Sequence, residues 1–358
     1  MKVLESMLLS ATACMFLTSA QGQVLATERA AFGLPPGQVA APNTPGGGVV
    51  VGRYVYVTDA VWGLRNYQPS DPNNADPVNS GTLIFDNAND GLSMGGTSLC
   101  VFFCHAGQVA YDGNQTVYIT AYDQPKGQPG SVDMPGVWRA TIDPVYGFIS
   151  PSALLVPHAG LAGNQPTAIA LGPDGNLYVG FLKNGSVVRI LNPLLDPSSP
   201  LQIVQSVGTS PNGRPIRSLA FIGSDLYVAS TGGLAVIKNA VSSLCLGGCN
   251  GAVVNDGFTG TAHVGIASDG INRLYMAIDG RGVWRYTVSN GAMQTVSTGG
   301  DDPNTGLPLT FAFVGGNSNL VMLDHLGNLW IGDDPSDGRT NFSGRIWYIS
   351  AAALGSLP

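Results

Sequence analysis

Apolar and polar residues alternate in short runs along this chain, and glycine-rich turns separate the runs. The clearest unit spans residues 166–190: an apolar run, a Pro-Asp-Gly-Asn turn, an alternating run from 177, a Lys-Asn-Gly turn and a second alternating run from 186. Alternation of this kind is typical of half-buried β-strands, and such turns join antiparallel strands. The unit therefore predicts three consecutive antiparallel strands.

The same unit recurs along the chain, with an aromatic residue in each second strand. These aromatics lie 48 to 62 residues apart, at Tyr56, Tyr118, Tyr178, Tyr227, Tyr275 and Trp330. A glycine then opens each predicted third strand, at Gly81, Gly136, Gly185, Gly233, Gly282 and Gly344. Repeated twisted sheets of about four strands pack radially and leave no long open edge. We predict an all-β fold, a six-bladed β-propeller formed by residues 46–358.

The last blade lacks an outer strand of its own. Its third strand ends near Ile349, and the remaining residues predict only a short helix at 351–354. An unpaired sheet edge invites aggregation. We therefore expect part of the N-terminal segment 21–45, around residues 24–32, to supply that strand and close the ring.

The first twenty residues resemble a secretory signal peptide. Lys2 precedes an apolar run from Met7 to Leu17, and the small residues up to Ala20 are typical of a cleavage site. The run is too short for a membrane span. The sequence thus predicts a secreted or periplasmic protein without a membrane span.

The overall charge limits the partners. Charged residues make up 11% of the chain, and the formal net charge is −7, without a basic stripe. This balance argues against a nucleic-acid partner. A small molecule or another protein remains as the partner, and the sequence does not distinguish them.

Four cysteines follow the predicted signal peptide in two matched settings. In an exported chain an even number of cysteines implies disulfides. The two pairs lie on opposite sides of a six-bladed ring, much farther apart than the roughly 7 Å between Cα atoms that a bridge can span. We predict the local bridges Cys100–Cys104 and Cys245–Cys249.

The longest predicted connections between second and third strands belong to blades six, one and two, which are neighbours in a closed ring. Long loops on a rigid scaffold are where binding usually occurs. Aromatic side chains offer contact area, and carboxylates select cationic or hydroxyl-rich groups. Packing between loops is the alternative role for the tyrosines. The candidate ligand-binding residues are Trp62, Tyr67, Tyr122, Asp123, Asp333 and Asp334.

The blade-one loop also suggests a divalent cation such as calcium. Asp71, Asn73 and Asp76 supply the oxygen ligands that calcium prefers. Their spacing is irregular, and two prolines interrupt it, so a turn-rich loop without a cation explains the same residues.

Two histidines are weak catalytic candidates. His105 follows Cys104 in a motif one residue longer than the c-type haem site, and a disulfide beside a loop histidine is the simpler interpretation. His105 and His263 both lie near the starts of innermost strands, where they could carry protons at the channel mouth or only line it.

The blade cores at 166–190, 219–228 and 321–331 resemble NHL-repeat propellers, the SMP-30/gluconolactonase group and streptogramin-lyase-like proteins. The resemblance covers most of the mature chain and is specific for fold only. The gluconolactonase group implies a central divalent metal, with ligands just before the innermost strands. The matching positions are Gly107, Thr167, Arg217, Ala262 and Asn319, of which only Asn319 is a sensible ligand.

Two function hypotheses follow. The first is an exported propeller that binds a ligand or protein partner on the face formed by the long loops. The alternative is a divalent-metal-dependent hydrolase, lactonase or lyase that acts at the channel mouth with Asn319, His105 and His263.

Overall fold

The computed structural model describes a chain that is almost entirely β, with one short helix, α1 (Ala351–Gly355), among its described residues. The helix matches the one predicted at the end of the chain. The described residues are 27–31, 45–52, 54–59, 63–67, 82–85, 105–122, 136–142, 153–157, 165–195, 199, 203–242, 249–279, 281–297, 300–301, 308–309, 320–333 and 345–355.

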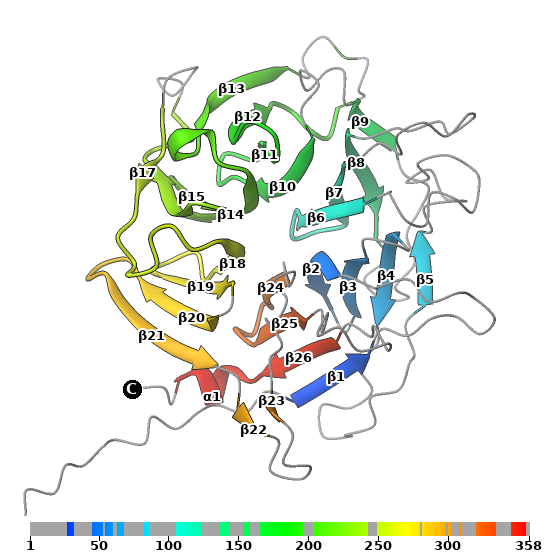
Figure 1. Cartoon of the computed structure of the whole chain (residues 1–358). Coiled ribbons are helices and arrows are strands. Elements are labelled where there is room, and N and C mark those ends of the chain that lie inside the picture. Colours follow the sequence, from blue (N-terminus) through cyan, green and yellow to red (C-terminus); the bar gives the residue numbers. More distant parts are fainter. Residues whose placement is uncertain are drawn as a thin grey trace, which may run out of the picture.

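Most described strands belong to four-stranded antiparallel sheets, which we number by their innermost strands (Figure 1). Sheet 1 consists of β2 (Pro45–Val51), β3 (Tyr54–Asp59), β4 (Gly63–Tyr67) and β5 (Thr82–Phe85). Sheet 2 consists of β6 (His105–Tyr111), β7 (Thr116–Tyr122), β8 (Gly136–Thr141) and β9 (Ala153–Pro157). Sheets 3 and 4 are β10 (Pro166–Leu171), β11 (Leu177–Phe181), β12 (Ser186–Ile190), β13 (Val204–Thr209), and β14 (Ile216–Ile222), β15 (Asp225–Ser230), β16 (Gly233–Ile237), β17 (Ala252–Val253).

Sheet 5 is β18 (His263–Ser268), β19 (Arg273–Ile278), β20 (Gly282–Thr287) and β21 (Ala292–Ser297). Sheet 6 has the order β24 (Leu320–Leu323), β25 (Leu329–Asp333), β26 (Arg345–Ile349) and β1 (Thr27–Ala31). Its outermost strand, β1, comes from the N-terminal segment and pairs antiparallel with β26. A separate pair, β22 (Gly300–Asp301) and β23 (Pro308–Leu309), was not predicted.

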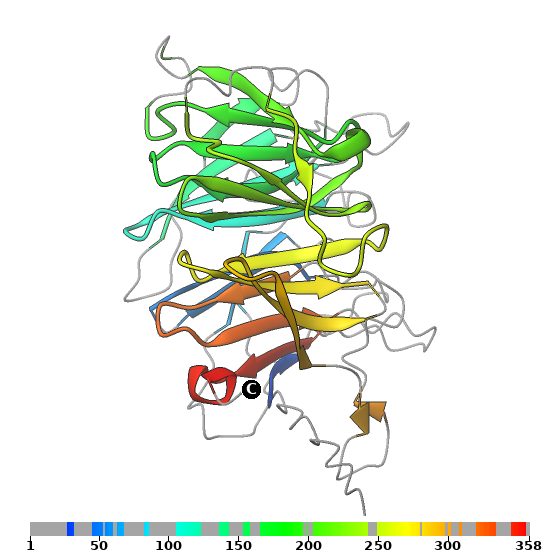
Figure 2. The same ribbon diagram turned by 90° about the vertical axis from the view of Figure 1, so that its left-hand side faces the viewer.

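The sheets surround a common centre, as Figure 1 shows, and the turned view in Figure 2 shows strands that run across the thickness of this ring. The innermost strands contact one another in a closed series: β2, β6, β10, β14, β18, β24 and again β2. Radial packing of four-stranded sheets is the architecture of a β-propeller.

The predicted aromatic anchors are all buried, with at most 6% of each residue exposed. Each main apolar cluster of the described core lies between two neighbouring sheets; Tyr178, for example, packs with Ile216 and Val228 of the next sheet. This division follows from the alternation of side chains along a strand, because the two faces of each sheet meet different neighbours.

Buried threonine hydroxyls link neighbouring sheets by donating to carbonyls of the next innermost strand. The Thr120 hydroxyl donates to the Thr167 carbonyl at 3.2 Å, and the Thr167 hydroxyl donates in turn to the Ile216 carbonyl at 2.7 Å. Thr58 donates to Gly107 in the same way. A buried carbonyl without a partner would cost stability, so these side chains satisfy strand ends that have no partner in their own sheet.

One predicted strand was wrong. The third strand of sheet 1 is β4 (Gly63–Tyr67), and the predicted third strand at 82–85 is the outer strand β5. The long segment 68–81 therefore joins the third strand to the fourth. Because consecutive strands are antiparallel, this connection begins at the opposite end of the sheet from the β3–β4 connection. The β4–β5 connection therefore begins at the opposite end of its sheet from the place where the β7–β8 and β25–β26 connections begin.

Burial, together with the negative charge of nearby Asp112, raises the pKa of the Tyr118 phenol to about 12. The unfolded chain releases this proton near pH 10, so between pH 10 and 12 the unfolded state loses a proton that the folded state keeps. Stability therefore falls as the pH rises, by about 2 kcal/mol at pH 12 for this residue. Urea unfolding measures the fall in unfolding free energy between pH 9 and pH 12. This fall should be about 2 kcal/mol smaller in Tyr118→Phe than in the wild type. An equal loss in both proteins would contradict the prediction.

Candidate functional site

Strand polarity defines one face of the ring, which we call the loop face. Here second strands end, third strands begin and the chain enters the innermost strands. Tyr122 and Asp333 are the last residues of β7 and β25, and His105 is the first residue of β6. His105 is also the Cα partner of Tyr122 across the β6–β7 pair. The topology thus brings these three predicted residues to the loop face.

The other predicted site residues divide into two groups. Tyr67 is the last residue of β4, at the end of sheet 1 opposite the loop face, where the segment with Asp71, Asn73 and Asp76 begins. Several predicted residues themselves lie outside the described ones: Trp62, Asp71, Asn73, Asp76, Asp123, Asn319, Asp334, Cys100, Cys104 and Cys245.

The sequence predicted His263 as an open group at the channel mouth, and the structure shows a buried side chain instead. Its side chain is fully buried, and Nε2 lies 2.6 Å from the equally buried Oδ2 of Asp256. Nδ1 lies 3.0 Å from the Thr261 carbonyl, which only accepts, so Nδ1 donates this bond. Asp256 Oδ1 also accepts from the Phe258 amide. The pair therefore fastens the connection between β17 and β18, and both ring nitrogens are engaged.

His263 and His105 also belong to different sectors. They begin β18 and β6, which lie across the centre from each other in the ring (Figure 1). The proton-carrying pair suggested by the sequence is therefore not assembled.

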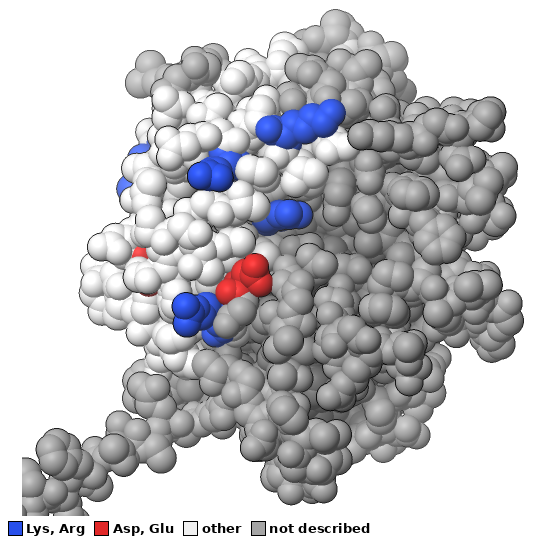
Figure 3. Space-filling view, viewed as in Figure 1, with Lys and Arg blue, Asp and Glu red and all other residues white. Residues whose placement is uncertain are grey.

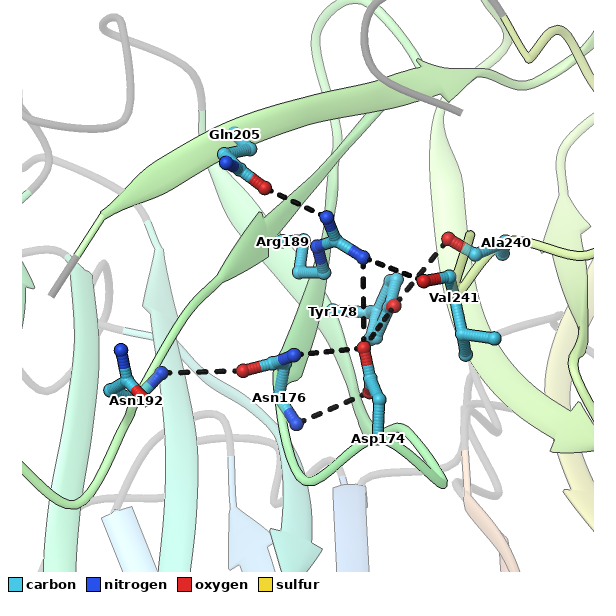
Figure 4. Close-up of polar contacts among 8 residues, drawn as sticks. All are labelled: Asp174, Asn176, Tyr178, Arg189, Asn192, Gln205, Ala240 and Val241. Atoms are coloured by element: carbon cyan, nitrogen blue, oxygen red, sulfur yellow. Dashed lines mark hydrogen bonds and ion pairs between the residues drawn. The ribbon is translucent and has the colours of Figure 1, made fainter. Parts of the chain in front are cut away.

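A buried arginine forms a second polar cluster, drawn in Figure 4. Arg189 donates from Nη1 to the Val241 carbonyl at 2.9 Å and from Nη2 to Gln205 Oε1 at 2.8 Å. Its Nη1 also lies 3.6 Å from Asp174 Oδ2, which accepts from the Tyr178 hydroxyl at 2.9 Å. Val241 lies in the connection that follows β16 of sheet 4, so this cluster joins two neighbouring repeats.

The arrangement around Arg189 repeats in other sheets. Arg139 donates to the Pro193 and Leu195 carbonyls of sheet 3, and Arg285 donates to the Leu354 carbonyl beyond sheet 6. All three arginines are Cα partners of the aromatic anchor in their sheet. An arginine opposite the aromatic anchor in three repeats is the sequence feature that could have predicted this contact with the next repeat. Its role is structural, because its donors are directed at backbone and side chains of the fold.

A cavity of about 60 Å³ lies at the centre of the ring. Pockets for organic ligands measure about 300–1,000 Å³, so this cavity admits only water-sized groups. An organic ligand would have to bind at its mouth. Residues from the innermost strands of all six sheets line it: Gly47, Gly48, Gln108, Val109, Ile169, Ser218, Leu219, Ile266, Leu320 and Val321.

Cationic side chains gather on the loop face over sheets 3 to 5. Topology places Lys183 in the β11–β12 turn, Arg214 before β14, Arg217 inside β14 and Arg281 in the β19–β20 turn. Figure 3 shows this half of the face, with blue side chains over the green and yellow sheets and a red patch between two of them. The acidic composition of the chain did not predict this cluster.

Comparison with known proteins supports the fold. No protein-family profile matches this sequence, and no curated protein matches it. A protein of unknown function from Bacteroides thetaiotaomicron has a TM-score of 0.58 at 11% identity, over 92% of this chain and 75% of its own. The calcium-binding protein regucalcin from Agrobacterium tumefaciens gives 0.53 at 14% identity over 86% and 90%.

A glucose dehydrogenase gives a TM-score of 0.51 at 13% identity, over 91% of this chain and 99% of its own. The chain has an SMP-30/NHL-like β-propeller fold. The propeller resemblance seen in the sequence is confirmed. At these identities the likeness establishes the fold and leaves the activity of this propeller open.

The described residues of this propeller do not fit the central metal that the resemblance implies. Gly107 has no side-chain ligand atom, Arg217 carries a positive charge, and the Thr167 hydroxyl donates to the Ile216 carbonyl. Thr167 is the bulge residue of β10, and in sheet 5 the register shift places the bulge at Val264. The position equivalent to Thr167 is therefore Val264, and Ala262 was matched wrongly. Across the described segments, no three His, Cys, Asp or Glu residues form a metal-binding group.

Two remaining predictions concern export and the membrane. Cys249 is disulfide-bonded, and its predicted partner Cys245 lies outside the described residues, so the pairing stays a prediction. None of the helices within the described part of this propeller has the length and hydrophobicity needed to cross a bilayer.

Proposed function

We propose that this chain is an exported six-bladed β-propeller that binds a ligand or protein partner on its loop face, in the sector of sheets 6, 1 and 2. The carrying observation is the position of the long connections. The β7–β8 and β25–β26 connections span 123–135 and 334–344, whereas β11–β12, β15–β16 and β19–β20 connections span only 182–185, 231–232 and 279–281. Both long connections begin at the loop face, beside the entries to the innermost strands.

Several observations support the ring itself. Among the described strands, six sheets have four strands each, and their innermost strands contact one another in a closed series. The antiparallel pairing of β1 with β26 supports closure by the N-terminal strand. Export rests on the predicted signal peptide at residues 1–20 and on the disulfide-bonded Cys249.

The proposed binding residues are Trp62, Tyr122, Asp123, Asp333 and Asp334. The corrected strand order removes Tyr67 and the segment 68–81 from this sector. Between its second and third strands, sheet 1 then contributes the connection 60–62, with Trp62. The aromatic groups would contact the body of the ligand, and the carboxylates would accept hydrogen bonds from hydroxyl or cationic groups. We do not extend the hydrolase hypothesis, because the His263 ring is engaged and the described metal positions lack ligands.

Binding is tested on protein purified from the secreted or periplasmic fraction, where an N-terminus at Gln21 checks export. Sugars, lactones, amino acids and calcium chloride are screened for a saturable rise in melting temperature. We expect Asp123→Asn combined with Asp334→Asn to weaken the binding of an active compound about tenfold or more, since a charge-assisted hydrogen bond contributes about 1.5–3 kcal/mol.

The matched control is Ile271→Ser, in an exposed turn at the opposite end of sheet 5. It should leave binding unchanged. The proposal fails if no compound in the screen binds, or if the control weakens binding as much as the loop variant.

A further inference from the structure

We infer that the ligand carries an oxyanion, such as a carboxylate, sulfate or phosphate group, which binds to Lys183, Arg214 and Arg217 at the mouth of the central cavity. We call these three residues the cationic rim. The inference rests on the proposed function and names the chemical class of its ligand.

Arg217 lies at the mouth because of a β-bulge. The β14–β15 register shifts between Ile216 and Ser218, which makes Arg217 the extra residue of the strand. Ser218, the next residue, lines the cavity. Bulges redirect side chains and are common beside functional sites. Arg217 is half-buried and directly precedes two residues that line the cavity, Ser218 and Leu219.

Arg214 is held on the same surface by its backbone and its aliphatic stem. The Ser210 hydroxyl donates to the Arg214 carbonyl at 2.6 Å. A Cβ added to Gly232 would lie 2.9 Å from Arg214 Cγ, so the stem passes directly over the β15–β16 turn. Arg214 as a residue is exposed. The backbone and aliphatic part of Arg214 are therefore held in place, and its charged end can adjust to a ligand.

Lys183 belongs to the same continuous surface. Its turn packs against the connection that carries Arg214, because the Ser210 amide donates to the Gly185 carbonyl at 2.6 Å. A Cβ added to Gly213 would also lie 3.3 Å from the Asn184 carbonyl. Two sheets thus bring Lys183 and Arg214 together from distant parts of the sequence.

Among the described residues, no contact of the fold uses the charges of the rim. None of the three side chains forms an ion pair or hydrogen bond with a residue in the described part of the chain, whereas Arg189, Lys238 and His263 do. Like charges repel each other, and a bound anion would relieve that repulsion. Arginine in particular binds carboxylate and phosphate through paired donors. The cavity is too small for an organic ligand, so the oxyanion binds at its mouth.

The test titrates full-length protein with inorganic phosphate, sodium sulfate and sodium citrate, with sodium chloride at matched ionic strength, and measures heat and melting temperature. We expect saturable binding of at least one oxyanion, weakened about tenfold or more by Arg217→Gln. Arg273→Gln is the control for a lost arginine charge, because Arg273 is exposed and lies at the opposite end of sheet 5. Unchanged circular dichroism establishes that the variants fold.

The inference is overturned if no oxyanion binds beyond the chloride control, or if Arg217→Gln binds as tightly as the wild type. It is also overturned if Arg273→Gln has the same effect. The paired variant Asp123→Asn with Asp334→Asn separates the two proposals. If it binds the oxyanion normally and Arg217→Gln does not, the rim stands without the loop sector; the reverse result supports the loop sector alone.

Discussion

Replacing Arg189 with methionine is expected to lower the free energy of unfolding by about 3 kcal/mol. Arg189 is buried, with 6% of the residue exposed. Its guanidinium donates two hydrogen bonds, one to the Val241 carbonyl and one to Gln205. Methionine keeps much of the volume and removes every donor. Loss of a charged hydrogen-bonding partner from a buried cluster costs about 3–5 kcal/mol, and the partial exposure of Asp174 favours the lower figure. Urea unfolding at neutral pH measures the change.

The control for Arg189 is an exposed ion pair. Lys238 Nζ lies 2.6 Å from Asp225 Oδ2, and 65% of the lysine side chain is exposed. Lys238→Met should cost less than about 1 kcal/mol, because solvent screens an exposed pair. Equal losses in the two variants would show that the cluster of Figure 4 does not join sheets 3 and 4.

Replacing Asp256 with alanine is expected to cost about 3–5 kcal/mol of unfolding free energy. The carboxylate is the partner of His263 Nε2 in a site where both side chains are fully buried. Its removal leaves a buried ring nitrogen without a partner, and the alanine also frees the Phe258 amide. The connection between β17 and β18 should loosen first, which hydrogen exchange at Phe258 and Thr261 would detect.

A double-mutant cycle measures the pair itself. His263→Phe keeps a ring in place of the imidazole, and it is combined with Asp256→Ala. We expect a coupling energy of about 2 kcal/mol or more, because the second substitution removes a partner that the first has already lost. Additive losses would mean that the two residues stabilise the fold independently.

The sequence predicted His263 as a site residue, and the structure shows it in a buried pair instead. His263 was recognised as a candidate because it begins an innermost strand, and that position is correct. Its partner Asp256 is seven residues earlier in an irregular connection, where local spacing has no meaning for side-chain contact. The cationic rim was missed for the same reason. Its members are separated along the chain, and only the packing of sheet 3 against sheet 4 brings Lys183 near Arg214.

The error in sheet 1 has a specific cause. Arg65 and Asn66 interrupt the apolar pattern of β4, whereas residues 82–85 read as a stronger strand behind a glycine. A glycine also opens β4, so the signal was present but weaker. Pairing of β4 with β3 depends on the neighbouring sheets as much as on its own side chains, because strand preference is set largely by packing.

The sequence by itself determined the all-β class, the repeated sheet, the buried aromatic of each repeat and the terminal helix. These features follow from alternation and turn chemistry within a few residues. Only the tertiary structure decided which connections share a face, which histidine is buried and where cations gather. Those outcomes depend on strand order and on contacts between sheets, which place residues from separate repeats side by side without leaving a periodic signal along the chain.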